Sequence, residues 1–151
     1  DAQKADWIEA MLTGTRSMAF GLTEPDHGSD ATWMETTAVR DAEGEHWIIN
    51  GAKRWNTGVH RATHDLVFAR TNGRAGSATG ITAFLVPTDT PGFEVPYYWW
   101  TFNMPSDHGE VTLQEVGELL RLTRERVRQI EIDGAARLGR ASLLKELDDG
   151  R

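Results

Sequence analysis

The composition of this 151-residue chain changes abruptly near residue 110, and that change constrains how the chain can be divided into folding units. All 6 Trp, all 5 His and all 5 Pro precede residue 110. Residues 1–110 carry 8 Lys and Arg against 15 Asp and Glu, whereas residues 111–151 carry 8 of each kind. The pattern predicts either two modules that meet near residue 110 or one domain with a helical tail.

The first module, residues 1–111, consists mostly of short segments with the character of β-strands. A short amphipathic helix is expected at its start, because apolar residues recur at helical spacing between Trp7 and Leu12. Prolines make residues 91–96 an edge strand or a loop. Branched and aromatic residues predict the strands, and Gly-containing stretches the turns. The expected strands cover residues 31–40, 45–55, 65–70 and 81–87, with turns at 41–44 and at Asn50–Gly51. Such strands are typical of an antiparallel β-sandwich or barrel-like module.

A loop rich in glycine, hydroxyl and carboxylate groups follows a further expected strand end, in the stretch FGLTEPDHGSD at residues 20–30. Gly28 and Ser29 can bring backbone N–H groups and a hydroxyl close to an anion, as a backbone nest does. An Asx and glycine turn between two strands would use the same residues. The residues alone therefore leave two interpretations open, a loop that binds phosphate or another ligand and a plain turn.

The longer pattern FGLTEPDHGSDATWMETTAVRDAEGEHWIINGAKRWNTG, followed by DLVFART, ITAFLVPTDTPGFEV and TFNMPSDHGEV, resembles the middle β domain of the acyl-CoA dehydrogenase family. The resemblance covers about residues 10–111 in the order and spacing of that family. It implies that this module holds FAD and that an acyl-CoA thioester is the substrate. Trp55 and Thr57 would flank the isoalloxazine ring, and Ser29 would also lie near the thioester. The residues implied to bind the cofactor are Phe20, Leu22, Thr23, Gly28, Ser29, Trp55 and Thr57.

This sequence departs from the family pattern after Trp55. Asn56 stands where the family usually has an apolar or small residue, and GVHRATH replaces the more usual Asn-Gly turn. The resemblance also implies a catalytic glutamate from a second helical domain, and no residue here takes its place. We therefore assign no catalytic residue and expect an oxidoreductase-like domain without turnover by itself.

Two further groups of residues, a histidine pair and an aromatic run, each have a functional and a structural interpretation. His60 and His64 have a spacing that binds metals on helices, but no third ligand follows at a telling distance, so no metal site is predicted. The run from Tyr97 to Trp100 is either a stacking surface for a base or a strand packed against neighbours. With 0 Cys, a disulfide or thiolate metal site is excluded. A polar, acidic start without a signal peptide and the lack of a long apolar run lead us to expect a cytoplasmic protein with no membrane partner.

The second module, residues 112–151, is expected to contain two helices joined by a turn. Thr112 and Glu115 form the capping-box pattern that begins a helix, and Thr123 is an N-cap candidate for a longer helix to about Arg140. Apolar residues of both helices face each other across the turn, an arrangement typical of a helix-turn-helix. The fold class expected for the whole chain is therefore α+β, a β module followed by a C-terminal helix-turn-helix.

The second helix of this module carries a polar face that either reads DNA bases or is a solvated charged surface. The stretch TLQEVGELLRLTRERVRQIE resembles the promoter-binding helix-turn-helix of primary sigma factors of bacterial RNA polymerase, and the resemblance extends over about residues 112–148. It implies promoter DNA and RNA polymerase as partners. The residues implied to contact DNA are Thr123, Arg124, Glu125, Arg126, Arg128 and Gln129. Three hypotheses follow: a fragment of a flavoenzyme, a DNA-binding module, and a folded chimera with neither activity.

Overall fold

The computed structural model describes residues 2–101 and 104–117, all of which lie in the first of two units, Asp1–Leu120 and Arg121–Arg151. One helix, α1 (Ala2–Leu12), precedes a sheet of seven strands, which confirms that a helix lies at the start of the module. The strands are β1 (Met18–Gly21), β2 (Thr37–Arg40), β3 (Trp47–Thr57), β4 (His64–Arg70), β5 (Ile81–Pro87), β6 (Phe93–Thr101) and β7 (Met104–Gly117). A short 3-10 helix, η1 (Ala31–Trp33), lies between β1 and β2.

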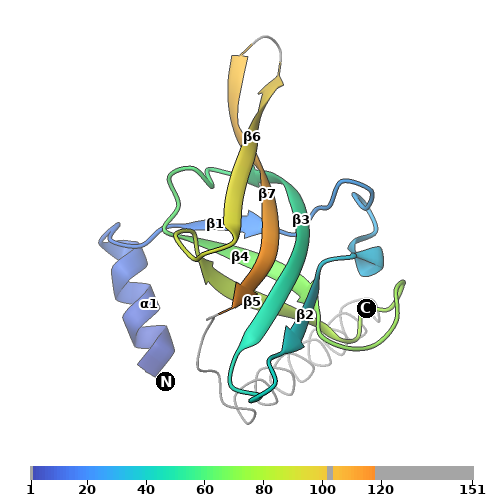
Figure 1. Cartoon of the computed structure of the whole chain (residues 1–151). Coiled ribbons are helices and arrows are strands. Elements are labelled where there is room, and N and C mark those ends of the chain that lie inside the picture. The colour runs from blue at the N-terminus through green and yellow to red at the C-terminus, as the bar shows by residue number, and fades with distance from the viewer. Residues whose placement is uncertain (1, 102–103, 118–151) are drawn as a thin grey trace, which may run out of the picture. The chain divides into compact units, whose positions relative to one another are not determined.

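The strands form one curled sheet and not two stacked sheets (Figure 1). Its order is β1-β4-β2-β3-β7-β6, and β5 pairs with β4. Most pairs are antiparallel, as expected, but β1 runs parallel to β4, and Thr37 of β2 forms a parallel bridge with Arg70. The antiparallel arrangement predicted from the sequence is wrong for β1 and β4. Because β2 and β3 intervene between them in the chain, no hairpin connects β1 to β4 and they can pair in parallel.

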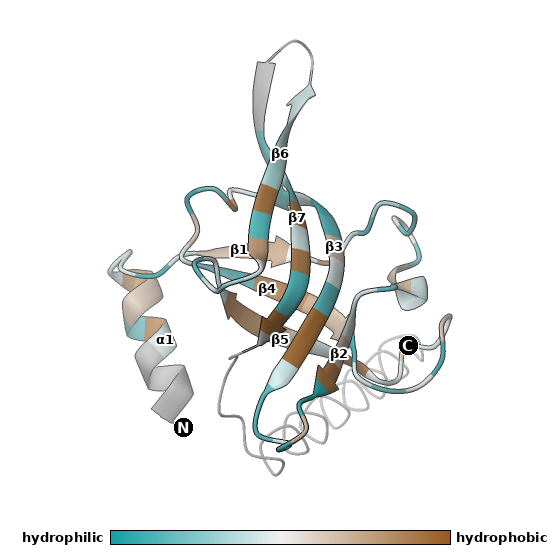
Figure 2. Ribbon diagram, in the orientation of Figure 1, coloured by the Kyte–Doolittle hydropathy of each residue, from teal (hydrophilic) through white to brown (hydrophobic). Residues whose placement is uncertain are grey.

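The core lies on the inner side of this curled sheet, where alternate residues of each strand meet. β4 buries Asp65, Val67 and Ala69 and leaves the residues between them partly exposed. This period of two is the geometry of a strand with one covered face, and apolar and polar bands alternate along β3 and β7 (Figure 2). The buried cluster comprises Ala19, Ala38, Ile49, Val59, Val67, Ala69, Phe84, Val86, Phe93, Val111, Leu113 and Val116.

The expected turn at Asn50–Gly51 is part of β3. The pairing of β3 with β7 shifts its register between Ile49 and Gly51, so the strand absorbs the irregularity as a bulge. Gly51 has a φ of 151° and lies so close to Thr36 that a Cβ would be 2.7 Å from the Thr36 Cα. The positive φ of Gly51 was predicted correctly, but it occurs at a bulge within β3 and not in a turn.

The helix expected to begin at Thr112 is also wrong. Residues 112–117 are the last part of β7, paired with β3 from Ala52↔Thr112 to Ile48↔Gly117. Val111, Leu113 and Val116 are buried there, and their burial against the sheet outweighs the local capping pattern. The sheet therefore continues past the change in composition near residue 110. The rest of the expected helix-turn-helix lies outside the described residues.

No helix in residues 2–101 or 104–117 combines the length and apolar character that a membrane span requires.

Candidate functional site

The loop between β1 and η1 is attached to β3 by its backbone. The Arg54 N–H donates to the Thr23 carbonyl at 2.8 Å, which places Thr23 directly beside β3. Glu24 and His27 then close a tight turn by two reciprocal backbone hydrogen bonds of 3.1 and 3.3 Å. Asp30 caps η1, because its carboxylate accepts from the Thr32 N–H at 3.0 Å. Gly28 and Ser29 are left exposed between these two anchors.

A buried ion pair holds the same loop from inside the sheet. The Lys53 Nζ of β3 lies 2.8 Å from Glu24 Oε1, and Lys53 is fully buried while Glu24 is nearly so. Glu24 also accepts from the backbone N–H groups of Glu35 and Thr36, at 2.6 and 3.0 Å. Burial would raise the pKa of Glu24, but the hydrogen bonds from Lys53 and the other donors outweigh it, so the pKa lies below its ordinary value. The carboxylate thus ties both ends of the loop to β3.

Trp55 and Thr57 lie on the exposed side of the end of β3. A second register shift, between Arg54 and Asn56, leaves Trp55 with a φ of 68°, uncommon for a residue with a side chain. The Trp55 ring is 42% exposed and packs on Trp99 of β6 with centroids 4.5 Å apart. The Thr57 hydroxyl is 2.9 Å from His108 Nδ1 of β7. The fold therefore presents an aromatic face and a hydroxyl two residues apart.

The other residues predicted from the resemblance lie along β1 and the loop that follows it. Phe20 is 52% exposed and contacts Phe68 of β4, with ring centroids 5.2 Å apart. Leu22 turns its carbonyl to Lys53 Nζ at 3.2 Å. The structure thus joins Leu22 and Thr23 to the strand that carries Trp55, while Gly28 and Ser29 lie further along the same loop.

An open pocket of about 340 Å³ lies beside this loop and does not coincide with the predicted flavin-binding residues. Its carboxylates include Glu24 and Glu35, and Glu35 lies 3.3 Å from His27 Nε2. The pocket is lined by Glu24, Pro25, Asp26, His27, Glu35, Thr36, Thr37, Asn50, Gly51 and Ala52. The residues that the resemblance implied, among them Trp55 and Ser29, are not part of the lining of this pocket.

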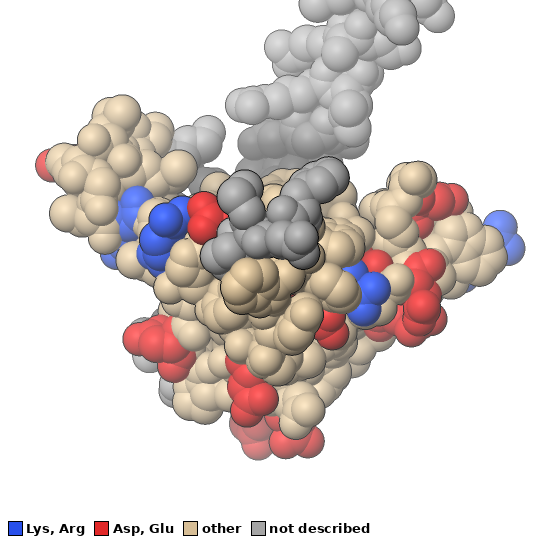
Figure 3. All heavy atoms as spheres, turned by 90° about the horizontal axis from the view of Figure 1, so that it is seen from above, with Lys and Arg blue, Asp and Glu red and all other residues tan. Residues whose placement is uncertain are grey.

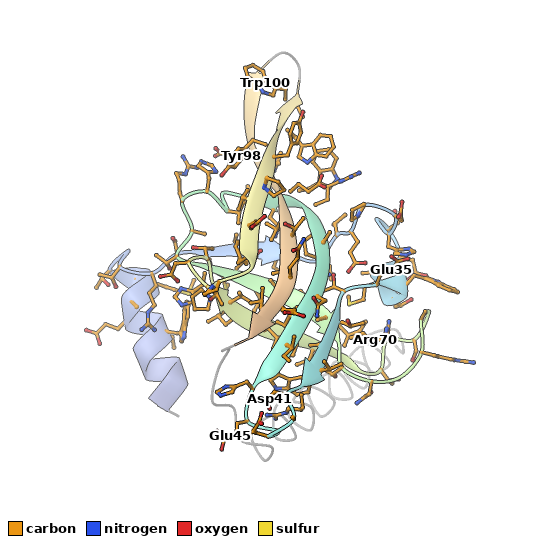
Figure 4. The ribbon with its side chains drawn as sticks, in the orientation of Figure 1. Glu35, Asp41, Glu45, Arg70, Tyr98 and Trp100 are labelled. Carbon is orange, nitrogen blue, oxygen red and sulfur yellow. The ribbon has the colours of Figure 1, made fainter. Side chains whose placement is uncertain are left out.

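Sequence reasoning missed three buried or half-buried polar groups that organise the site. The Arg70 guanidinium donates to the Thr32 carbonyl at 2.5 Å and reaches two carbonyls of the loop after β4, Ser77 and Thr79, at 3.3 Å. Figure 4 shows Glu35 and Arg70 toward the right of the view. Asn56 and Asp65 form a fully buried hydrogen-bonded pair. A charged residue directly beside an apolar run, such as Asp65 in DLVFA, is the sequence pattern that could have indicated a buried polar group.

The remaining candidates have structural contacts of their own. His60 packs edge-on against Tyr98 and lies 3.6 Å from Asp107, whereas His64 packs against Trp7 of α1. In the described parts of the chain, no group of three or more His, Asp or Glu side chains could hold a metal ion. Residues 97–100 belong to β6, whose projecting part carries Tyr98 and Trp100 (Figure 4). The DNA-contacting residues predicted between 123 and 129 lie outside the described residues.

Comparison with protein families gives two matches. The family model of the acyl-CoA dehydrogenase middle domain matches residues 19–116. The model of sigma-70 region 4 matches residues 98–139. The two matches share residues 98–116, whose described residues, 98–101 and 104–116, belong to β6 and β7.

Individual relatives agree with the first match. The human mitochondrial short-chain specific acyl-CoA dehydrogenase is 46% identical over 90 residues, which are 60% of this chain and 21% of the relative. The bovine enzyme is 34% identical over 149 residues, 99% of this chain and 34% of the relative. The crystal structure of a glutaryl-CoA dehydrogenase from Mycobacterium smegmatis, in complex with FADH2, is similar with a TM-score of 0.66 and 36% identity. That match covers 79% of this chain and 29% of the other. This chain therefore spans about a fifth to a third of the length of these proteins.

Proposed function

Because this chain belongs to the acyl-CoA dehydrogenase family through its middle domain, we propose that it contributes one wall of a binding site for FAD and an acyl-CoA thioester. The observation that carries the proposal is the exposed pair Trp55 and Thr57 next to a loop that the buried Glu24–Lys53 ion pair holds in place. A relative of similar fold was crystallised in complex with FADH2, which supports a flavin as the cofactor.

The kinds of side chain present support a flavin as the ligand. The exposed face of Trp55 can cover an apolar ring, while the hydroxyls of Thr23 and Thr57 can hydrogen-bond to a polar ring edge. Phe20 of β1 and Leu22, which follows the end of β1, add further apolar side chains. Gly28 and Ser29 offer backbone donors and a hydroxyl to a phosphate, and Ser29 also to the thioester.

When bound, FAD would supply the hydride acceptor for oxidation of the acyl chain. This chain's own residues would bind and orient the flavin and exclude water from one of its faces. Proton removal from the substrate needs a base beside its reacting carbon, and we assign that role to no residue of this chain. We propose that this chain binds the ligands without turning the substrate over.

Titration of FAD into the full chain, followed by flavin fluorescence, tests this function. We expect saturable binding, weakened roughly fivefold by Trp55→Ala because an aromatic contact of this kind contributes about 1 kcal/mol. Trp7→Ala is the matched control, since Trp7 belongs to α1 and its ring packs on His64 of β4. Absence of saturable binding, or equal affinity in both variants and the parent, would contradict the proposal.

A second candidate function rests on the match of sigma-70 region 4 to residues 98–139. We propose that the C-terminal module contacts promoter DNA, and through it RNA polymerase, using Thr123, Arg124, Glu125, Arg126, Arg128 and Gln129. The net charge of −7 opposes approach to phosphate, and acidic side chains gather in several places on the face shown in Figure 3. Binding should therefore be weak and strongly dependent on salt. We also propose a cytoplasmic location, which is compatible with both flavin binding and DNA binding.

Fluorescence anisotropy with a duplex carrying the minus-thirty-five hexamer, against a scrambled duplex, tests the DNA-binding function. We expect preference for the hexamer that is lost in Arg124→Ala and Gln129→Ala and kept in Arg74→Ala, a change at an exposed arginine of the β module. Equal affinity for both duplexes would leave the flavin-binding proposal as the only function.

A further inference from the structure

Two fully buried polar side chains meet where β1, β3 and β4 come together. Asn56 of β3 donates from Nδ2 to Oδ2 of Asp65 on β4, at 2.5 Å. The amide oxygen of Asn56, Oδ1, and the second carboxyl oxygen of Asp65, Oδ1, are buried without a hydrogen-bond partner. Buried polar atoms are nearly always paired, so this pair of oxygens requires an explanation.

Both unpaired atoms are acceptors when Asp65 is ionised, and two acceptors cannot satisfy each other. A neutral carboxylic acid carries an O–H donor, which an ionised carboxylate lacks. A neutral acid and a primary amide can pair in both directions, with the amide N–H on one acid oxygen and the acid O–H on the amide oxygen. One proton on Asp65 would thus satisfy both oxygens at once.

We propose that Asp65 and Asn56 form a proton-dependent latch, closed when Asp65 is a neutral acid and weakened when Asp65 ionises. Burial raises the pKa of Asp65 to about 6, although the Asn56 hydrogen bond and the Lys53 charge act in the opposite direction. Lys53 of β3 is the charged group that faces Asp65, and it is itself paired with Glu24. The residues opposite Asp65 in register, Ala19 of β1 and Val86 of β5, carry no charge.

The latch bears directly on the backbone of Gly21, the last residue of β1. A Cβ on Gly21 would lie 2.8 Å from Asn56 Nδ2 and 3.1 Å from Asp65 Oδ2, so this residue packs against the pair without room for a side chain. Leu22 and Thr23 follow immediately and begin the loop of the candidate site. If the proposed flavin-binding function holds, the latch makes the base of that loop sensitive to pH.

The direction of the pH effect follows from the shift in pKa. The folded chain holds the Asp65 proton more tightly than the unfolded chain, so the stabilisation is full below the ordinary value near 3.8. It is lost as the pH rises through about 6. A shift from 3.8 to about 6 corresponds to roughly a hundredfold change in the folding equilibrium constant.

Urea unfolding of the full chain, followed by tryptophan fluorescence between about pH 4 and pH 8, tests the latch. Asp65→Asn keeps the size and supplies a permanent donor, so it imitates the neutral acid. Relative to this variant, we expect the folding equilibrium constant of the parent to fall by roughly a hundredfold across the range. Asp89→Asn, at an exposed position after β5, is the control and should not stabilise the chain at neutral pH. A ratio between parent and Asp65→Asn that stays constant with pH would overturn the proposal.

A second measurement on the parent chain covers the case in which Asp65→Asn does not fold. The carboxyl carbon of Asp65, assigned by NMR, should titrate with a midpoint near 6. A midpoint at or below the ordinary value of Asp would overturn the latch. Neither measurement contains flavin, so its result is distinguishable from failure of the proposed cofactor binding.

Discussion

Lys53→Met tests whether the buried ammonium group organises the loop of the candidate site. Lys53 Nζ lies 2.8 Å from Glu24 Oε1 with both side chains out of water. At an effective dielectric constant of about 20, two charges at this distance attract by roughly 6 kcal/mol before the penalty of desolvation. Methionine fills a similar volume but removes the charge, which leaves the Glu24 carboxylate buried with only its two backbone donors.

Removal of one partner of a buried ion pair typically destabilises a protein by about 3–5 kcal/mol. With a urea m-value of about 2 kcal/mol per molar, the unfolding midpoint should fall by roughly 1.5–2.5 M. Urea unfolding followed by tryptophan fluorescence measures this shift. The double variant Glu24→Gln/Lys53→Met should recover part of the loss, because a neutral amide is less costly to bury than an unpaired carboxylate.

Arg74→Met is the matched control, since it also replaces a cation by methionine but at an exposed position. It should change the free energy of unfolding by no more than about 0.5 kcal/mol. A Lys53→Met variant that stays within the range of this control would show that the buried ammonium group does not stabilise the fold. A double variant as unstable as the sum of the two single variants would show that the two side chains are not coupled.

Three further changes test other parts of the fold. Gly51→Ala should lower the melting temperature by roughly 10 °C, because a Cβ overlaps Thr36 and costs about 2 kcal/mol; an unchanged melting temperature would show that the bulge relaxes freely. Phe84→Ala should destabilise the chain by about 3–5 kcal/mol in urea unfolding, and a loss under about 1 kcal/mol would mean that Phe84 is not a core residue. Burial would raise the pKa of Glu24, but its hydrogen bonds lower the pKa below the ordinary value of a glutamate. The ionised Glu24 therefore stabilises the fold at pH values above that ordinary pKa, and this contribution is lost as the pH falls through the lowered pKa of the folded chain. Glu24→Gln should therefore flatten the acid side of the pH–stability profile, and a profile that keeps its slope would contradict this assignment.

The sequence was sufficient to predict most elements of the β module. Residues 81–87 were predicted as a strand from their branched and aromatic composition and form β5, and the turn at 41–44 joins β2 to β3 as an antiparallel hairpin. These features depend on neighbours in the chain, whose side-chain and backbone preferences are local. The loop at 23–30 was predicted for the same reason, since its glycines, hydroxyls and carboxylates are adjacent in sequence.

Residues 112–117 show where local preference loses to long-range packing. A capping-box pattern there predicts a helix, yet pairing with β3 and burial of Val111, Leu113 and Val116 make a strand. The pattern of apolar residues was compatible with either structure over so short a stretch. Only the presence of β3 alongside decides between them.

The sequence alone was enough to name candidate residues for the site, because a motif and its spacing can be read without the fold. The tertiary structure alone decided that Lys53 reaches back to Glu24, that Asn56 meets Asp65, and that a bulge turns Trp55 outward. The physical reason is that charge pairing and burial depend on distances across the sheet. Residues 29 positions apart in the chain can lie 2.8 Å apart in space, and only folding sets that distance.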